Sequence, residues 1–241
     1  MLTFLHLPKT GGHSFKQLLV DRFGPDGVAY ANGLAGYRAL RRDWQPGRWQ
    51  ALHGHMPIGV PAALGVPEQY FVVLRDPVDR FVSDYYHLVN TPAHPNHHVV
   101  VEQRITLREY AAVPCHPVSR GAQNGQVRRL ATYDLDTVAA DGSHWWSGAW
   151  DADRSTLERA KRNLRDRVRH IGLVERMDES MSRFADLLGL SRVRSPRENV
   201  SPQRVEVSSL GRETVAAIRA ANQLDIELYD YAQELFERQA A

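Results

Sequence analysis

Close to its start the sequence carries a short run that could bind an anion and neutralise negative charge. The run from Pro8 to Ser14 (PKTGGHS) follows the apolar stretch 3–7 and precedes a helix-like stretch at 15–23. A strand that enters a glycine-containing loop and then a helix presents backbone N–H groups to a bound anion. Lys9 adds a compact positive charge, and Thr10 and Ser14 add hydroxyl donors. The run therefore predicts a phosphate- or sulfate-binding loop.

A second candidate for anion binding is Arg75, which ends the most apolar run of the chain, 70–75. Asp76 suits the N-cap of a following helix, and Pro77 suits its first position. Arg75 should therefore lie at the carboxyl edge of a sheet, where ligands bind in open α/β folds. Its planar fork matches a phosphate, and Ser83, two turns into the helix, can add a hydroxyl donor.

A candidate base follows the strand-like stretch 49–53, in the sequence His53-Gly54-His55. Alternation along an extended chain aims both imidazoles to one face. A neutral imidazole beside an anion-binding loop can take a proton from a hydroxyl group. We predict His55 as the base, with the ordinary pKa of about 6.5, and His53 as a supporting donor. The alternative is that both histidines make only structural hydrogen bonds.

The elements that must position these residues alternate between strand and helix patterns, which is typical of an α/β domain with a mainly parallel sheet. Apolar spacings of three and four predict helices that carry one apolar stripe each. The expected strands are 3–7, 49–53, 70–75 and 170–174, and the expected helices are 15–23, 78–89, 157–168, 177–188 and 224–235. The stretches 91–98 and 137–150 are expected to be loops.

Composition limits the class of protein. The chain has 241 residues, 43% of them hydrophobic, and this favours a single domain spanning 1–241. The net charge is only +2, so the protein lacks the strongly positive surface potential that marks a nucleic-acid-binding protein. The single cysteine, Cys115, excludes an intrachain disulfide, and no 18-residue apolar span is present. We expect a soluble, cytoplasmic protein without a transmembrane segment.

The first loop differs from a Walker A motif, in which the lysine follows the glycines. It resembles the 5′-phosphosulfate loop of sulfotransferases that use 3′-phosphoadenosine 5′-phosphosulfate (PAPS). The stretch 71–83 resembles the 3′-phosphate motif of the same family, and the His-Gly-His sequence resembles heparan sulfate 2-O-sulfotransferase-like members. The resemblance implies a P-loop-like sulfotransferase fold and assigns the PAPS site to Lys9, Thr10, Gly11, Gly12, His13, Ser14, Arg75 and Ser83.

Three later stretches resemble the same family in the same order: 123–130 near the acceptor cleft, 171–177 on a late strand, and 197–202 in a loop over the nucleotide. The resemblance leaves gaps at 24–47 and 132–152, where the acceptor would be chosen. Residues that could contact a saccharide acceptor are Arg38, Arg41, Arg42, Arg128, Arg129, Trp145, Trp146 and Trp150. Solvated helix faces and a lid anchored by the tryptophans are the alternatives.

The predicted reaction is transfer of a sulfuryl group from PAPS to a hydroxyl acceptor, with Lys9 neutralising the leaving phosphate. Should neither His53 nor His55 be the base, Glu102 and His116 are the next candidates. We expect no metal requirement, because a sulfuryl group bears less charge than a phosphoryl group and Lys9 can neutralise the leaving phosphate. His94, His97 and His98 could form a metal cluster, but the flanking prolines and the lack of a carboxylate partner favour a solvated loop. Two alternatives are a nucleotide-dependent P-loop phosphotransferase, which would need Mg²⁺, and a non-catalytic module that binds PAPS or a glycan.

Overall fold

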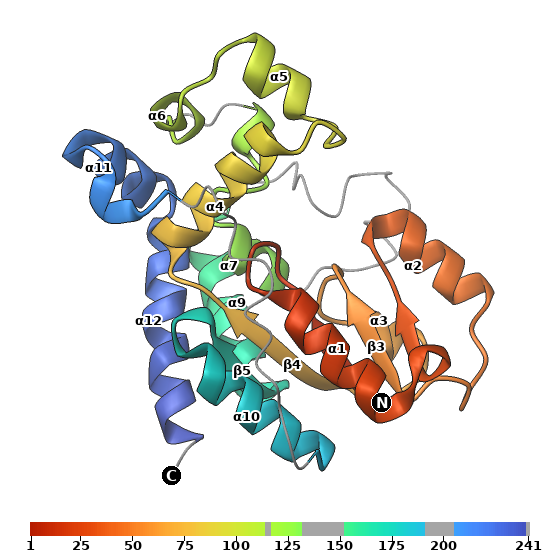
Figure 1. Ribbon diagram of the computed structural model, residues 1–241. Coiled ribbons are helices and arrows are strands. Elements are labelled where there is room, and N and C mark those ends of the chain that lie inside the picture. The colour runs from red at the N-terminus through yellow and green to blue at the C-terminus, as the bar shows by residue number, and fades with distance from the viewer. Residues whose placement is uncertain (114–116, 132–151, 191–204, 240–241) are drawn as a thin grey trace.

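Five parallel strands form the centre of the fold in a computed structural model, which describes residues 1–113, 117–131, 152–190 and 205–239 (Figure 1). The strand order is β2-β3-β1-β4-β5, and every neighbouring pair is parallel. The bounds are β1 Leu2–Leu5, β2 Val28–Tyr30, β3 Ala51–Gly54, β4 Gln69–Leu74 and β5 Val168–Leu173. The predicted α/β class with a mainly parallel sheet is confirmed.

Alternate residues of the strands face two different helix layers, because successive side chains of a strand point to opposite faces. One face is covered by α1 (Gly12–Phe23) and α10 (Met177–Leu188), which lie in front of the sheet in Figure 1. Its core is aromatic: Phe71 stacks on Phe184 with ring centroids 4.0 Å apart, and Phe4 packs against both. This aromatic layer fixes α1, and hence the loop that precedes it, against β1.

The opposite face is mostly aliphatic, and we call it the aliphatic face; it is covered by α7 (Gly125–Leu130), α9 (Arg154–Asp166) and α12 (Gln223–Arg238). Leu5 and Val72 of the sheet pack in this layer with Leu164 and Leu228 of the helices. Because α12 follows most of the chain in sequence, this layer joins the carboxyl-terminal region to the strands that lead into the predicted site.

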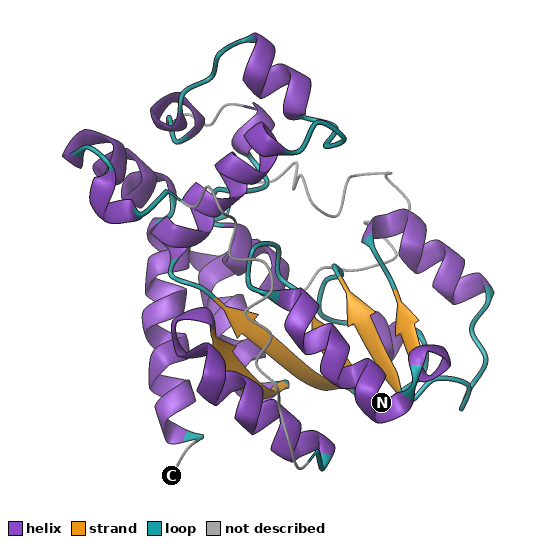
Figure 2. Ribbon diagram, in the orientation of Figure 1, coloured by secondary structure: helices purple, strands orange, loops and turns teal. Residues whose placement is uncertain are grey.

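A third group of helices extends beyond the sheet at the top of Figure 1 and has its own apolar core. It is formed by α4 (Pro77–Asn90), α5 (His97–Glu102), α6 (Leu107–Tyr110) and α11 (Arg212–Ala221). Within the described residues the remaining helices are α2 (Gly33–Arg42) and α3 (Val60–Ala63), with short 3-10 turns at Pro25–Gly27, Pro117–Ser119, Val174–Arg176 and Val207–Ser209. Figure 2 shows how loops join this group to the sheet.

The helices predicted from apolar spacing are all present, and α10 has the predicted bounds. Two expectations were wrong at their margins. His97 and His98 begin α5 instead of belonging to a loop, and the short β2 with α2 fills a stretch for which we had predicted no element. The predicted loop 137–150 lies outside the described residues. Ala152, which follows it, packs against the core of the aliphatic face.

Candidate active site

The predicted residues follow three adjacent strands at one edge of the sheet. β1 lies between β3 and β4, and all three run in the same direction. At their carboxyl ends, β3 leads into His55, β1 into Lys9 and β4 into Arg75. The anion-binding loop is therefore central, with the candidate base on one side of it and the candidate 3′-phosphate ligand on the other.

The loop turns through two left-handed residues before α1 begins. Lys9 has φ 69° and Gly11 has φ 73°. A non-glycine residue at positive φ is uncommon and often marks a functional loop. The N-cap of α1 is Gly11, which has no side chain that could cover the first N–H groups of the helix. This terminus suits the anion that the sequence predicts.

The hydroxyl of Thr10 has a different partner from the one predicted. It donates to the carbonyl oxygen of Leu7 at 2.8 Å, and the side chain is fully buried. Thr10 therefore stabilises the turn of the loop with its side chain, and only its backbone N–H can face a ligand. Ser14 is half-buried and His13 is exposed, both in the first turn of α1.

Lys9 is half-buried and lies near two charged groups, Asp84 of α4 and Arg75, which follows β4. Burial lowers the pKa of its ammonium group, the carboxylate of Asp84 opposes this, and Arg75 lowers it further. The carbonyl oxygen of Lys9 accepts a hydrogen bond from Nη1 of Arg75 at 3.1 Å. The two cations of the predicted PAPS site are thus joined directly, through the backbone of the loop.

Arg75 follows the last residue of β4 and is held at both ends. Asp76 caps α4 as predicted, because its Oδ1 accepts from Val78 N at 2.9 Å and from Asp79 N at 3.0 Å. Nη2 of Arg75 lies 3.7 Å from Oδ1 of Asp79. Ser83 lies farther along α4 and is half-buried. The predicted order of Arg75 before a capped helix that carries Ser83 is present.

His55 is oriented by a residue that the sequence analysis missed. Its Nδ1 lies 2.8 Å from the carbonyl oxygen of His6, and the ring of His6 stacks on the ring of His55 with centroids 4.1 Å apart. A carbonyl oxygen can only accept, so Nδ1 carries the proton in the neutral ring. The basic atom of neutral His55 is therefore Nε2, as a general base requires.

The ordinary pKa near 6.5 that we expected for His55 is wrong in this environment. Burial lowers the pKa of His55 to about 4, the hydrogen bond to His6 opposes this, and the charge of Arg129 lowers it. Burial together with the neighbouring histidines lowers the pKa of His53 to about 3 and of His6 to about 2. All three rings are neutral at pH 7, which is the state that accepts a proton.

His53 lies on the same face of the sheet as His55, as alternation predicts, but in an apolar setting. Its side chain is 5% exposed, and its ring stacks at 5.5 Å on Phe4, His6 and Tyr30. Within the described part of the chain neither ring nitrogen has a hydrogen-bond partner. His53 therefore packs the wall behind His55, and no hydrogen bond joins it to the candidate base.

Gly12 is needed because the imidazole of His6 lies against the start of α1. A Cβ at position 12 would meet Nε2 of His6 at 2.0 Å, and nothing but a hydrogen fits there. His6 thus touches the anion-binding loop on one side and His55 on the other. No local sequence signal marked His6 for this role, because its contact with His55 depends on the pairing of β1 with β3.

Gly54 separates the two histidines and gives the first testable prediction. It has φ 151°, and a Cβ there would lie 1.8 Å from the carbonyl oxygen of Ala31. Gly54→Ala must push β2 away from β3, so we expect a loss of about 1–3 kcal/mol in the free energy of unfolding, measured by urea denaturation.

Gly211→Ala is the matched control for Gly54→Ala. Gly211 has φ −63° and no atom within 4 Å of an added Cβ. It is the N-cap of α11, where alanine is less favourable than glycine, but alanine also lowers the entropy of the unfolded chain, so the unfolding free energy should change by less than about 1 kcal/mol. Equal effects of the two substitutions would contradict the close approach at Gly54.

Of the other candidates from the sequence, Arg129 lies close enough to His55 for its charge to lower the pKa of that histidine, and the rest lie elsewhere or outside the described residues. Glu102 is exposed at the end of α5, while His116, Trp145, Trp146, Trp150 and the stretch 197–202 are not described. Arg38, Arg41 and Arg42 lie exposed on α2. Arg129 donates from Nη1 to the carbonyl oxygen of Gly125 at 2.8 Å, so it braces α7. His94 accepts from Asn96 N at 3.1 Å and is part of a hydrogen-bonded loop.

Comparison with known proteins decides the family. The model of the sulfotransferase family matches residues 1–232. The chain belongs to the sulfotransferase family. The predicted resemblance to PAPS-dependent sulfotransferases is thereby confirmed, and with it the expectations of an enzyme and of PAPS as the sulfuryl donor.

Among curated relatives, this sulfotransferase is similar to three heparan-sulfate 6-O-sulfotransferases. It is 29% identical to isoform 1 of Cricetulus griseus over 99% of this chain and 67% of that protein. It is 29% identical to isoform 1 of Homo sapiens over 99% of this chain and 66% of that protein. It is 27% identical to isoform 2 of Danio rerio over 98% of this chain and 58% of that protein. The chain thus spans about two thirds or less of the length of these relatives.

A solved structure, mouse sulfotransferase SULT7A1 complexed with PAP, is similar over 91% of this sulfotransferase and 62% of its own chain, with a TM-score of 0.41 and 12% identity.

The three relatives are named as 6-O-sulfotransferases, whereas the His-Gly-His sequence resembles 2-O-sulfotransferase-like members. In the described part of the chain, no helix has the length and apolar character needed to cross a membrane.

Proposed function

We propose that this sulfotransferase transfers the sulfuryl group of PAPS to a saccharide hydroxyl, with His55 as the general base. The observation that carries the proposal is the order of groups along one sheet edge: His55, then the loop with Lys9, then Arg75. In that order the hydroxyl acceptor approaches from the β3 side and the nucleotide lies over β4. A non-catalytic module that only binds PAPS or a glycan would not need a general base on the acceptor side.

The chain contributes three effects to the reaction. PAPS supplies the activated sulfuryl group. Nε2 of His55 takes the proton of the acceptor hydroxyl while its oxygen forms the new bond to sulfur. Lys9 neutralises the negative charge that develops on the departing 5′-phosphate, and the N–H groups at the start of α1 stabilise the sulfuryl oxygens. Because these donors are fixed before substrate binds, little reorganisation is needed at the moment of transfer.

A glycan acceptor is favoured by the names of the relatives, which are heparan-sulfate sulfotransferases. Incubation with PAPS and a panel of glycans, small alcohols and no acceptor tests this directly by mass spectrometry. The expected result is a mass increase of one sulfuryl group on a saccharide, without added Mg²⁺. Phosphate transfer that depends on Mg²⁺ would instead support a P-loop phosphotransferase. The cytoplasmic location stays a prediction.

Arg75 and Ser83 are proposed to bind the 3′-phosphate of PAPS, and this gives the second testable prediction. Arg75→Ala should weaken binding of 3′-phosphoadenosine 5′-phosphate (PAP) by about 10- to 100-fold, the scale of a lost hydrogen bond to a charged group. Ser83→Ala should weaken it less, because a neutral hydroxyl is lost. Calorimetry with PAP and with adenosine 5′-phosphate (AMP), which lacks the 3′-phosphate, measures both effects.

AMP binding is the internal control for this pair of substitutions, since general misfolding would weaken both ligands together. Arg48→Ala is a matched control, because Arg48 is an exposed arginine that stacks on Trp49 at 4.6 Å. It precedes β3, at the amino end of the parallel strands, whereas Arg75 follows the carboxyl end of β4. Equal losses of PAP and AMP affinity in Arg75→Ala would refute the assignment of this arginine.

A further inference from the structure

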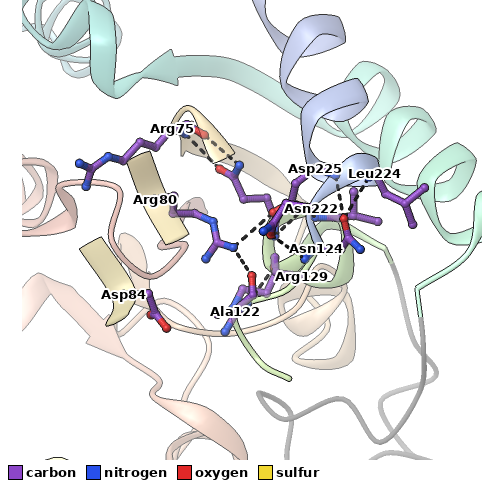
Figure 3. A network of polar contacts seen from close by, with 12 residues as sticks. Arg75, Arg80, Asp84, Ala122, Asn124, Arg129, Asn222, Leu224 and Asp225 are labelled. Carbon is purple, nitrogen blue, oxygen red and sulfur yellow. Dashed lines mark hydrogen bonds and ion pairs between the residues drawn. The ribbon is translucent and has the colours of Figure 1, made fainter. Parts of the chain in front are cut away.

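Two helices on the aliphatic face cap each other through side chains that are far apart in sequence (Figure 3). Asn124 precedes α7, and its Oδ1 accepts from the N–H groups of Leu224 at 3.0 Å and Asp225 at 3.1 Å, at the start of α12. In return, Oδ1 of Asp225 accepts from Gln126 N at 3.1 Å and Val127 N at 2.8 Å, at the start of α7. Each helix thus satisfies N–H groups that the other helix leaves open.

This reciprocal cap contains a buried ion pair. Asp225 is fully buried, and its Oδ2 lies 3.3 Å from Nη2 of Arg80 in α4, which is 1% exposed. A buried carboxylate is tolerated only when its charge and lone pairs are satisfied. Here one cation and the N–H groups of α7 do this. The position of α7 relative to α4 and α12 is therefore set with little freedom.

Gln126 carries this fixed position to the sheet edge. Its Oε1 accepts from the backbone N–H of Arg75 at 3.0 Å, and its Nε2 donates to the carbonyl oxygen of Arg75 at 2.9 Å. Arg75 directly follows β4, whose last ladder partner is Leu74 opposite Leu173. Arg75 has no partner in the β4–β5 ladder, and the side-chain amide of Gln126 instead forms hydrogen bonds with both the N–H and the carbonyl oxygen of Arg75.

The side chain of Arg75 leaves this anchor in the other direction. Figure 3 shows its guanidinium pointing away from Arg80 and the capped helices. On that side Nη1 donates to the carbonyl oxygen of Lys9. With the backbone of Arg75 fixed by two hydrogen bonds, the direction in which its fork points is limited to the side of the anion-binding loop.

We propose that Gln126, held by Asp225, is a positioning residue that aims Arg75 at the 3′-phosphate of PAPS. This rests on the proposed function, because it presumes that Arg75 binds the 3′-phosphate. In this role Gln126 acts through the backbone of Arg75, to which its amide is hydrogen-bonded. The carboxyl-terminal helix α12 is thereby part of the support for nucleotide selectivity.

The test compares the affinities of PAP and AMP, measured by calorimetry on the full chain. Gln126→Met keeps the length of the side chain but removes both hydrogen bonds to Arg75. We expect its Kd for PAP to rise about tenfold, the scale of one lost hydrogen bond to a charged group, while its Kd for AMP changes less than about twofold. Gln126→Asn keeps an amide but is too short to span both backbone groups, so it should show the same selective loss.

Gln123→Met is the matched control, because Gln123 is also a buried glutamine, whose Nε2 donates to Ala112 O at 3.1 Å and to Ser119 Oγ at 3.3 Å. It should lower the melting temperature without changing the ratio of PAP to AMP affinity. An unchanged ratio in both Gln126 variants overturns the positioning role alone. A parent protein that binds PAP no more tightly than AMP overturns the 3′-phosphate site and this role together.

Discussion

Replacing Lys9 by alanine is expected to lower kcat by at least about 10²-fold, the scale for removing one preorganised electrostatic stabiliser. Lys9 lies between the end of β1 and the start of α1, and its backbone already bonds to Arg75. The departing phosphate gains negative charge only as the sulfuryl group leaves. The substitution should therefore reduce kcat more than it raises the Kd for PAPS. Single-turnover rates beside calorimetry separate the two effects.

Lys16→Ala is the matched control for Lys9→Ala. Lys16 belongs to the same helix and loop region, but its side chain is exposed and lies over the ring of Tyr30 at 6.0 Å. Its removal lowers the net charge equally and should leave kcat within about twofold, as for most surface substitutions. If Lys9→Ala and Lys16→Ala have the same kcat, Lys9 has no part in transfer.

The residues around Lys9 influence the pKa of its ammonium group. Burial lowers the pKa of the ammonium group, and Asp84 counteracts this from α4. Tyr110 holds Asp84 in place, since its hydroxyl donates to Oδ2 of Asp84 at 2.8 Å. A bound phosphosulfate would add further negative charge and favour the protonated amine. Asp84 and a bound anion therefore both favour the cationic form of Lys9.

Much of the site followed from the sequence because its signals are local. The loop around Lys9 and the cap at Asp76 each need only a few consecutive residues to be recognised. Strand ends in a parallel sheet meet at one edge, so the grouping of Lys9, His55 and Arg75 also followed from pattern alone. These are features in which spacing along the chain fixes position in space.

The rest depended on contacts between distant parts of the chain. Gln126 reaches Arg75 across 51 positions, and Asp225 reaches Gln126 across 99. No spacing rule predicts such a partner. The stacking of His6 on His55 likewise depends on the pairing of β1 with β3. The lowered pKa of His55 comes mainly from burial, which also depends on how distant parts of the chain pack. The short β2 was missed because three residues give no periodicity.

Replacing His55 by alanine is expected to abolish measurable transfer while leaving the Kd for PAPS nearly unchanged. The ring lies on the β3 side of the loop, away from Arg75 and the proposed nucleotide position. Loss of a general base costs about 10²- to 10⁴-fold in rate. His170→Ala is the control: it is a half-buried histidine inside β5, and its loss should leave transfer intact.

The pH dependence distinguishes His55 from His53. Because burial lowers the pKa of His55 to about 4, its neutral, basic form persists down to about that pH. The value of kcat/KM for PAPS reports the free enzyme, so it should be flat from pH 6 to 8 and fall only near about pH 4–5. The anionic nucleotide favours the protonated ring, so the fall in kcat should lie at a higher pH. His53→Ala should keep this profile at a reduced rate, since His53 only packs behind the base.

Acid unfolding must be measured beside this profile, because the same burial makes stability depend on pH. The folded-state pKa values of His6, His53 and His55 lie below the unfolded value of 6.5, so the unfolded chain binds protons first as the pH falls. The free energy of unfolding should therefore be highest above about pH 6.5 as far as these histidines are concerned, and it should fall as the pH drops below that value. Circular dichroism at each pH separates this loss from protonation of the base. A profile that survives in His55→Ala, but is lost in His53→Ala while the protein stays folded, would assign the base to His53.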